Sequence, residues 1–186
     1  DSSSVASRIN GALPVVSVAA TTSAFAAIRQ DGSVVTWGDA NNGGSSEAVA
    51  LSLNGAVAVT KVVSSNSAFA ALRTDGSVIT WGNAITGGDS SQLTGALTGT
   101  KGVVNIYANG AAFAALRADG SVLTWGYGAD GGDSSEVSAA LDGTVDVESI
   151  VANDHAFAAL RADGSVVTWG SFLGGGNSSA VSQALD

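Results

Sequence analysis

Four tryptophans divide this chain into equal intervals, and this spacing constrains the fold more than any other feature of the sequence. Each tryptophan follows the previous one by 44 residues, and phenylalanines, arginines and aspartates keep the same register without insertion or deletion. The four sets are Trp37, Trp81, Trp125 and Trp169; Phe25, Phe69, Phe113 and Phe157; Arg29, Arg73, Arg117 and Arg161; and Asp31, Asp75, Asp119 and Asp163. Such a period is typical of stacked repeat architectures, so we divide the chain into units at 11–54, 55–98, 99–142 and 143–186.

The first ten residues are in register with the ends of the units. Residues 1–10 read DSSSVASRIN, and residues 177–186 read NSSAVSQALD. We therefore interpret residues 1–10 as the tail of a preceding unit and the chain as a segment of a longer array, which the absence of methionine also favours. A short native protein with a leading partial repeat is the alternative.

Each unit carries β-strand signals. In the last unit the runs AFAALR (156–161) and SVVTWG (165–170) flank Ala162-Asp163-Gly164, and a third apolar run, VDVESIVAN (145–153), precedes them. Asp-Gly between two apolar runs predicts a hairpin with a type I′ turn, whose two central residues need positive φ. Apolar residues occupy alternate and intervening positions of the hairpin, so we expect a sheet that is covered on both faces.

The segment after each Trp-Gly loop is harder to assign. Ser-Ser-x-x-Val-x-x-x-Leu recurs there and fits one or two helical turns, but an outer strand or an ordered loop fits nearly as well, so residues 46–54 and their equivalents stay open. A three-stranded unit cannot bury both faces by itself, whereas stacking on the next unit buries them. The sequence therefore predicts an all-β protein of tandem 44-residue repeats, with blades of three to four strands.

The stretch VANDHAFAALRADGSVVTWG (151–170) resembles the repeat of the regulator of chromosome condensation family. The positions that carry the resemblance are His155, Ala159, Leu160, Asp163, Gly164, Val166, Trp169 and Gly170. The Asp-Gly…Trp-Gly core recurs in all four units, and the likeness extends over essentially the whole chain. The resemblance implies a β-propeller in which each unit forms one blade. In repeat length the chain is most similar to the propeller-type β-lactamase inhibitory proteins.

Three features depart from the family pattern. The family's histidine occurs once, because Ser23, Ser67 and Ala111 replace it elsewhere, and Gly-Gly pairs replace the Gly-Gln-Leu-Gly segment after Trp-Gly. The family closes a ring of about seven blades, whereas this chain carries four units. Missing sequence or a second copy of the chain would complete the ring. Otherwise the units form an open stack, whose two exposed ends favour head-to-tail association.

Charge and composition exclude several classes of function. Lys and Arg number 7 against 16 Asp and Glu, so we expect neither nucleic-acid binding nor insertion into, or attraction to, membranes. No cysteine is present to form a disulfide, a thiolate metal site or a thiol nucleophile. His155 is the only histidine and has no repeating partner, so we assign it a structural role. We predict no catalytic residues, no enzyme activity and no cofactor.

Three repeated features have a structural and a functional interpretation. The tryptophans and phenylalanines are predicted to form the repeat core by packing between units, with a carbohydrate- or base-stacking ladder as the alternative. The repeated arginines and aspartates are predicted to pair and hold the hairpin turn, with a ring of anion-binding guanidiniums as the alternative. The acidic loop Asp130-Gly131-Gly132-Asp133, with Glu136, is predicted to be solvated; a Ca²⁺ site is the alternative, although EF-hand spacing is lacking.

Apolar residues interrupt loops that otherwise favour Gly, Asn and Asp after each Trp-Gly. They are Ile85, Tyr127, Phe172 and Leu173. Repeat scaffolds bind through variable loops on one face, and aromatic side chains anchor interfaces, so we predict that these four residues contact a protein. Chance exposure is the alternative. In the β-lactamase inhibitory proteins such loops contact the enzyme, which the resemblance permits here.

Three functions fit these observations. The first is a non-enzymatic, extracellular or cell-surface repeat segment with a structural or adhesive role, from a larger surface protein or filament, with proteins and copies of itself as partners. The second is a protein-binding propeller, similar to an enzyme inhibitor, that acts through the loops after Trp-Gly. The third, suggested by the family resemblance alone, is a guanine-nucleotide exchange factor, which the acidic composition and the number of units disfavour.

Overall fold

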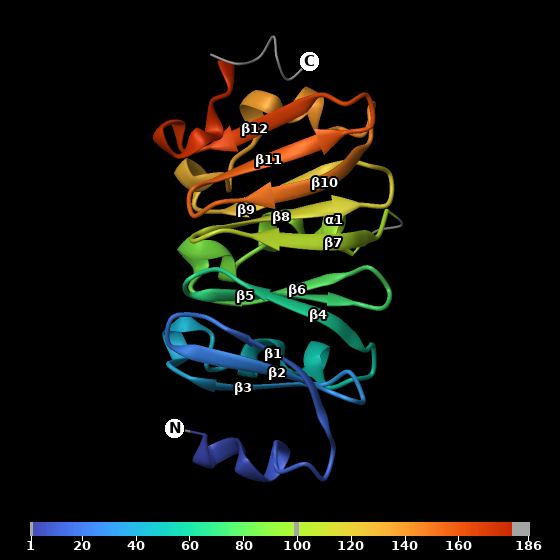
Figure 1. Ribbon diagram of the computed structural model, residues 1–186. Coiled ribbons are helices and arrows are strands. Elements are labelled where there is room, and N and C mark those ends of the chain that lie inside the picture. The colour runs from blue at the N-terminus through green and yellow to red at the C-terminus, as the bar shows by residue number, and fades with distance from the viewer. Residues whose placement is uncertain (1, 99–100, 180–186) are drawn as a thin grey trace.

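In the computed structural model, which describes residues 2–98 and 101–179, four three-stranded antiparallel sheets follow one another along the chain (Figure 1). The predicted all-β class and its repeating units are therefore confirmed. The strands are β1 (Val15–Ala20), β2 (Ala24–Arg29), β3 (Val34–Gly38), β4 (Val59–Ser64), β5 (Ala68–Arg73), β6 (Val78–Gly82), β7 (Val103–Ala108), β8 (Ala112–Arg117), β9 (Val122–Gly126), β10 (Val147–Ala152), β11 (Ala156–Arg161) and β12 (Val166–Gly170). Each sheet keeps the strand order of the sequence, as in β1-β2-β3.

The same residue pairs recur in every sheet. Phe25 of β2 lies opposite Trp37 of β3, with the two rings stacked and their centroids 5.3 Å apart. The equivalent pairs in the other sheets are 5.2 to 5.3 Å apart. Cross-strand aromatic pairs stabilise antiparallel sheets, so the Phe and Trp positions keep a common register.

The hairpin turn differs from the predicted type I′ turn. Only glycines have a positive φ among the described residues, so Asp31 cannot be a central residue of a type I′ turn, and Gly32 alone is left-handed (φ 76°). The amide of Gly32 donates to the carbonyl of Arg29 (2.8 Å), and the amide of Arg29 donates to the carbonyl of Ser33 (2.9 Å). This is a type I turn followed by a glycine bulge. The prediction was wrong because the loop has three residues, and only its third residue needs the left-handed conformation.

Alternate residues of each central strand face opposite neighbours in the stack. In β5, Ala68, Ala70 and Leu72 pack forward on the third sheet. Phe69 and Ala71 pack back on the first sheet. All five are buried, so the second sheet is covered on both faces. The hydrophobic core therefore consists of three successive interfaces between units rather than one central cluster.

Short helical turns occupy residues 3–8, the loops after Trp-Gly and the segment that the sequence left open. They are η1 (Ser3–Arg8), η2 (Ala40–Asn42), η3 (Glu47–Leu53), η4 (Ala84–Gly88), η5 (Ser91–Leu93), α1 (Thr94–Leu97), η6 (Gly128–Asp130), η7 (Ser135–Ala140) and η8 (Phe172–Gly176). The open segment contains η3, η5 with α1, and η7, and most of its fourth equivalent, residues 178–186, lies outside the described residues. A hydrogen bond between the hydroxyls of Thr36 and Ser46 (3.0 Å) ties this segment to its own sheet, and η3 packs on β6 of the next. In the same way η1 packs on β3, which places it where the tail of a preceding unit would lie.

The stack is open. The first and fourth sheets lie at opposite ends of the column in Figure 1, and the sheets do not close into a ring. The first strands of successive sheets pack on one another, β1 on β4 and β4 on β7. Helical turns such as η3, which packs on β6, lie between the third strands of successive sheets. Within the described residues, no helix has the length and apolar character that a membrane span requires.

Candidate protein-contact surface

The loops after Trp-Gly and the turns between first and second strands share one edge of the stack, which we call the loop edge. It consists of residues 20–23 and 39–44, 64–67 and 83–88, 108–111 and 127–132, and 152–155 and 171–176. Hydrogen bonds from the turns to the loops bring the two sets of residues together. The hairpin turns, residues 29–33 and their equivalents, lie at the other ends of the central strands.

One short polar side chain per unit anchors the loop edge, and the sequence analysis missed it. The Oγ1 of Thr21 accepts a hydrogen bond from the amide of Ala24 (2.9 Å) and donates one to the carbonyl of Asn42 (3.0 Å). The equivalent residues Ser65, Asn109 and Asn153 donate to the carbonyls of Thr86, Asp130 and Gly174 at 2.9, 2.6 and 2.7 Å. The available signal was a repeat position that holds only short side chains able both to donate and to accept.

The first residue caps the loop in three of the four units. The cap accepts a hydrogen bond from a backbone amide further along: Asp39 from Asn41 (2.8 Å), Asn83 from Ile85 (3.0 Å) and Ser171 from Gly174 (3.3 Å). Tyr127 holds the equivalent position in the third unit and makes no side-chain cap hydrogen bond. An aromatic side chain thus stands where the other units have a stabilising polar group.

All four apolar residues that we predicted as contacts lie exposed on the loop edge. The exposed fractions are 67% for Ile85, 48% for Tyr127, 72% for Phe172 and 95% for Leu173. They do not share one repeat position, since Asn41 and Ala129 hold the place of Ile85 and Leu173 in the other units. The stack gathers them because each loop occupies the same place in its unit.

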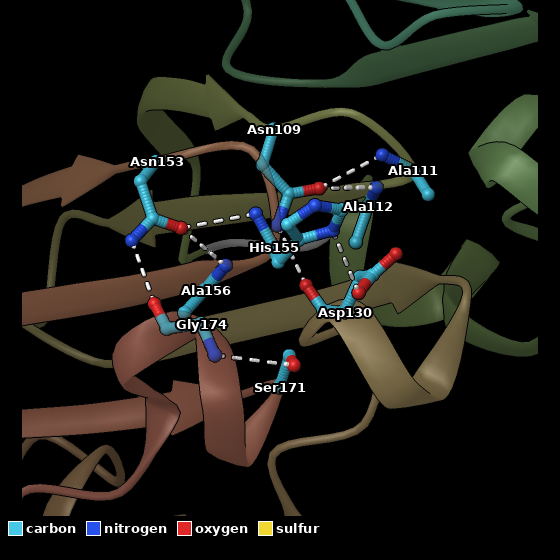
Figure 2. A network of polar contacts seen from close by, with 9 residues as sticks. All are labelled: Asn109, Ala111, Ala112, Asp130, Asn153, His155, Ala156, Ser171 and Gly174. Atoms are coloured by element: carbon cyan, nitrogen blue, oxygen red, sulfur yellow. Dashed lines mark hydrogen bonds and ion pairs between the residues drawn. The ribbon is translucent and has the colours of Figure 1, made fainter.

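His155 joins the third and fourth units at the loop edge (Figure 2). Its Nδ1 lies 3.2 Å from Oδ1 of Asp130, while Asn109 donates to the carbonyl of that aspartate. The loop that carries Tyr127 is therefore held by a neighbouring unit as well as by its own. A histidine–aspartate pair also occurs in hydrolytic triads, but Nε2 of His155 has no hydroxyl partner in the part of the chain that the structure describes. This arrangement positions a loop.

The repeated arginines and aspartates meet through a serine at the hairpin turns. In the third unit the Oγ of Ser121 accepts from Nε of Arg117 (2.7 Å) and donates to Asp119 (2.5 Å). The other turns repeat this link. Asp119 also accepts from Lys101, and this contact, ahead of the serine, lowers its pKa well below the usual range. The guanidiniums are therefore engaged in holding the turns.

The hairpin-turn edge and the loop edge differ in where cationic side chains lie. Four of the 7 cationic side chains lie in the hairpin turns, whereas the loop edge contains no Lys or Arg and carries Asp39, Asp130 and Asp154. The exposed apolar side chains are thus set in an acidic surface.

The aromatic pairs lie in the interfaces between units. Trp81, Trp125 and Trp169 are buried, and their indole N–H groups donate to the carbonyls of Gly43, Gly87 and Gly131 in the preceding unit at 3.0, 3.0 and 3.1 Å. The ring of Phe69 lies so close to Gly43 that an added Cβ would come within 2.6 Å of it. Buried rings cannot form an exposed stacking ladder. Phe25 and Trp37 in the first unit are partly exposed.

The acidic loop of the third unit does not gather metal ligands. Asp130 faces His155, and Asp133 accepts from the amide of Ser135 (2.9 Å), a hydrogen bond that lowers the pKa of this carboxyl. Across residues 2–98 and 101–179, no three acidic or histidine side chains come close enough to hold a metal ion.

No family model matches this chain, and no curated protein matches it significantly. Solved structures do resemble it. Prp20p from Saccharomyces cerevisiae is 18% identical, with a TM-score of 0.59 over 84% of this chain and 44% of its own. Human WBSCR16 is 20% identical, with a TM-score of 0.57 over 86% of this chain and 48% of its own. The CRINKLY WD40 ectodomain of the Arabidopsis thaliana receptor kinase ACR4 is 15% identical, with a TM-score of 0.54 over 88% and 51%.

Another solved structure describes Prp20 as yeast RCC1, and this decides the type of repeat. The fold is that of regulator of chromosome condensation β-propeller repeats. At these identities the likeness concerns the fold alone, and the predicted resemblance is confirmed at that level. The chain spans about half the length of these neighbours or less. The likeness to the β-lactamase inhibitory proteins stays a prediction.

Proposed function

We propose that this chain is a non-enzymatic repeat scaffold with a structural or adhesive role, extracellular or at the cell surface, that contacts a protein through its loop edge. The observation that carries the proposal is the surroundings of Tyr127. This residue replaces a loop cap, leaves its ring half-exposed, and lies on a loop that is clamped by Asn109 and by His155 through Asp130. At this position a half-exposed tyrosine replaces the polar cap that stabilises the loop in the other units.

Rigid presentation favours binding. Each loop of the edge is anchored by the residue at position 21, 65, 109 or 153, so the backbone that carries the apolar side chains of the second, third and fourth units is held in place before a partner arrives. Pre-ordered contacts lose less conformational entropy on association. Aromatic side chains on such a frame are the usual anchors of protein interfaces.

Charge indicates the kind of partner. The loop edge combines exposed apolar side chains with carboxylates and lacks Lys and Arg, so it fits a protein surface that presents Lys or Arg beside apolar residues. Solved neighbours show that this fold can bind proteins, since Prp20p is described as binding Gsp1p and histones, and as bound to Kap60. Those partners belong to Prp20p. None of the described residues supports guanine-nucleotide exchange as the function.

The contact surface can be tested with a matched pair of variants. The immobilised chain is exposed to the secreted and surface proteins of its source. The Tyr127→Ser/Phe172→Ser variant is compared with Leu51→Ser, whose side chain is even more exposed but lies off the loop edge in η3. We expect wild type and Leu51→Ser to retain the same bound protein and the double variant to lose it, with thermal stability unchanged in all three. Equal retention by the double variant would contradict the proposal.

The location has its own test. Low charge, acidity and near-identical tandem units support an extracellular or surface array. Antibodies raised against the chain should label intact cells of the source organism, and external protease should remove that label. Labelling that requires permeabilised cells would overturn the extracellular assignment and leave the contact surface untouched.

A further inference from the structure

The two ends of the stack are the separated halves of an interface that the chain itself contains three times. The face toward the preceding unit presents Phe and Trp rings, and the face toward the next unit presents alanines and a Leu or Ile. We call the exposed face of the first sheet, with Val15, Val18, Phe25 and Trp37, the leading face. We call the exposed face of the fourth sheet, with Ala158, Leu160, Gly164 and Gly175, the trailing face.

The leading face has the side chains of an internal interface without their partners. Phe25 is 44% exposed, whereas its equivalents Phe69 and Phe113 are 0% exposed. Val18 is exposed where Ile106 is buried. The indole N–H of Trp37 has no hydrogen-bond partner within the described chain, although each of the other three indoles bonds to a glycine carbonyl.

Residues of the trailing face are exposed where their equivalents inside the stack are covered. Leu160 is 41% exposed, whereas Leu116 is buried. Gly87 is covered by the ring of Phe113, with an added Cβ 2.4 Å from that ring, but an added Cβ at Gly175 meets only a distant amide of Asn153. Gly120 is likewise covered by Asp146 of the next unit, while no atom of the described residues lies within 4 Å of an added Cβ at Gly164.

We propose that the leading face of one copy of this chain docks on the trailing face of a second copy and reproduces the internal interface. This inference rests on the proposed scaffold function and names a partner for it, a second copy of this chain. The second copy is the occupant because its trailing face presents the kind of surface that covers the Phe and Trp rings at each of the three internal interfaces.

The internal register assigns the contacts between copies. Trp81, Trp125 and Trp169 donate to Gly43, Gly87 and Gly131, so Trp37 of the first copy would donate to the carbonyl of Gly175 in the second copy. Val147 donates its amide to Gly120, so Val15 would donate to Gly164. At the loop edge Thr22 donates to Asn66, Asn66 to Gly110 and Gly110 to Asp154, so Asp154 of the second copy would donate to Thr22 of the first copy and continue the row.

The position of η1 limits what the second copy supplies. Residues 1–10 are in register with residues 177–186, and η1 already packs on β3. The second copy therefore contributes its strands and its 171–176 loop, because η1 of the first copy already covers β3. Each chain has one leading and one trailing face, so the contact is heterologous and either closes on itself or continues as a chain of copies.

Complementation between two blocked variants tests the inference. Phe25→Asp puts a charge on the leading face, and Leu160→Asp puts one on the trailing face; both side chains are exposed in the single chain, so each variant should fold. Analytical ultracentrifugation should show concentration-dependent association of the wild type and association at least about tenfold weaker for either variant alone. An equimolar mixture should form a complex of two chains and nothing larger, because each variant keeps one intact face.

Two controls separate the alternatives. Leu51→Ser removes an exposed apolar residue of η3, away from both end faces and from the loop edge, and should associate as the wild type does. A wild type that stays monomeric at its highest soluble concentration, or a mixture that fails to pair, overturns the inference. Association through two leading faces would also overturn it, since Leu160→Asp alone would then still dimerise. Binding by the loop edge is measured separately and does not depend on any of these outcomes.

Discussion

Phe113 and Phe25 occupy the same position of their repeats, yet only Phe113 is fully buried. Each stacks on a tryptophan of its own sheet at 5.3 Å. Phe113 is 0% exposed because Gly87 of the preceding unit covers it, whereas Phe25 is 44% exposed with only η1 below its sheet. The comparison teaches that a phenylalanine at this position is fully buried only where a neighbouring unit covers it. Stability should therefore follow the interfaces.

The largest effect should come from truncating the two phenylalanines. Phe113→Ala removes a ring from a packed interface and should lower the free energy of unfolding by about 3–5 kcal/mol. Phe25→Ala should lower it by about 1–2 kcal/mol, because 44% of that residue is already exposed and it keeps only its own sheet as a neighbour for the ring. Urea unfolding of the two variants measures the difference, and equal losses would break the comparison.

A glycine pair gives the next largest effect. Gly87 and Gly175 have φ values of 99° and 94°, so alanine is strained at both positions. At Gly175 the added methyl meets open space, and we expect a loss of about 1–2 kcal/mol from the backbone alone. At Gly87 it also strikes the ring of Phe113, and we expect about 2–4 kcal/mol. Thermal unfolding of Gly87→Ala and Gly175→Ala tests whether close approach adds to the backbone cost.

A smaller effect is expected at acidic pH, where two equivalent turns should contribute differently to the melting temperature. Asp119 and Asp75 hold equivalent positions and both have a lowered pKa, but Asp119 alone of the two accepts from a lysine, Lys101. A lowered folded pKa stabilises the fold above the pKa of the unfolded chain, and this contribution is lost as the pH falls. Lys101→Met should therefore weaken the fall in melting temperature between about pH 5 and pH 2.

Lys61 supplies the control for the acid experiment. Its ammonium donates to the side chain of Asn105 (2.7 Å) and to the carbonyl of Ile106 (3.2 Å), and neither group titrates. Lys61→Met should leave the pH dependence of the melting temperature close to that of the wild type. An equal change in both lysine variants would mean that overall charge, not the Lys101–Asp119 contact, determines the response.

The smallest effect should be a gain in stability at the loop edge. Tyr127→Asn restores the cap that Asn83 provides in the second unit, and it should raise the free energy of unfolding by up to about 1 kcal/mol. Calorimetric melting of this variant measures the gain. A clear loss of stability would mean that the tyrosine ring packs against its surroundings, and it would weaken the assignment of Tyr127 as a contact residue.

The repeat pattern predicted more of the fold than of the contact surface. Phe, Trp and the Asp-Gly turn recur because one interface is built three times, so their period alone indicates strands and stacking. The turn type was wrong because a three-residue loop and a two-residue loop share the same Asp-Gly pair. The anchors Thr21, Ser65, Asn109 and Asn153 were missed because three residue types perform one task, and identity of letters does not reveal it.

The period of 44 residues by itself determined the unit, its three strands and the need for neighbours, because local strand pairing and apolar alternation act within a few residues. Only the tertiary structure decided that the four sheets remain an open stack, that His155 reaches Asp130 of the preceding unit, and that the leading and trailing faces are left uncovered. These features depend on how one sheet is placed on the next. That placement is set by close contacts such as Phe113 on Gly87, which join residues far apart in the chain.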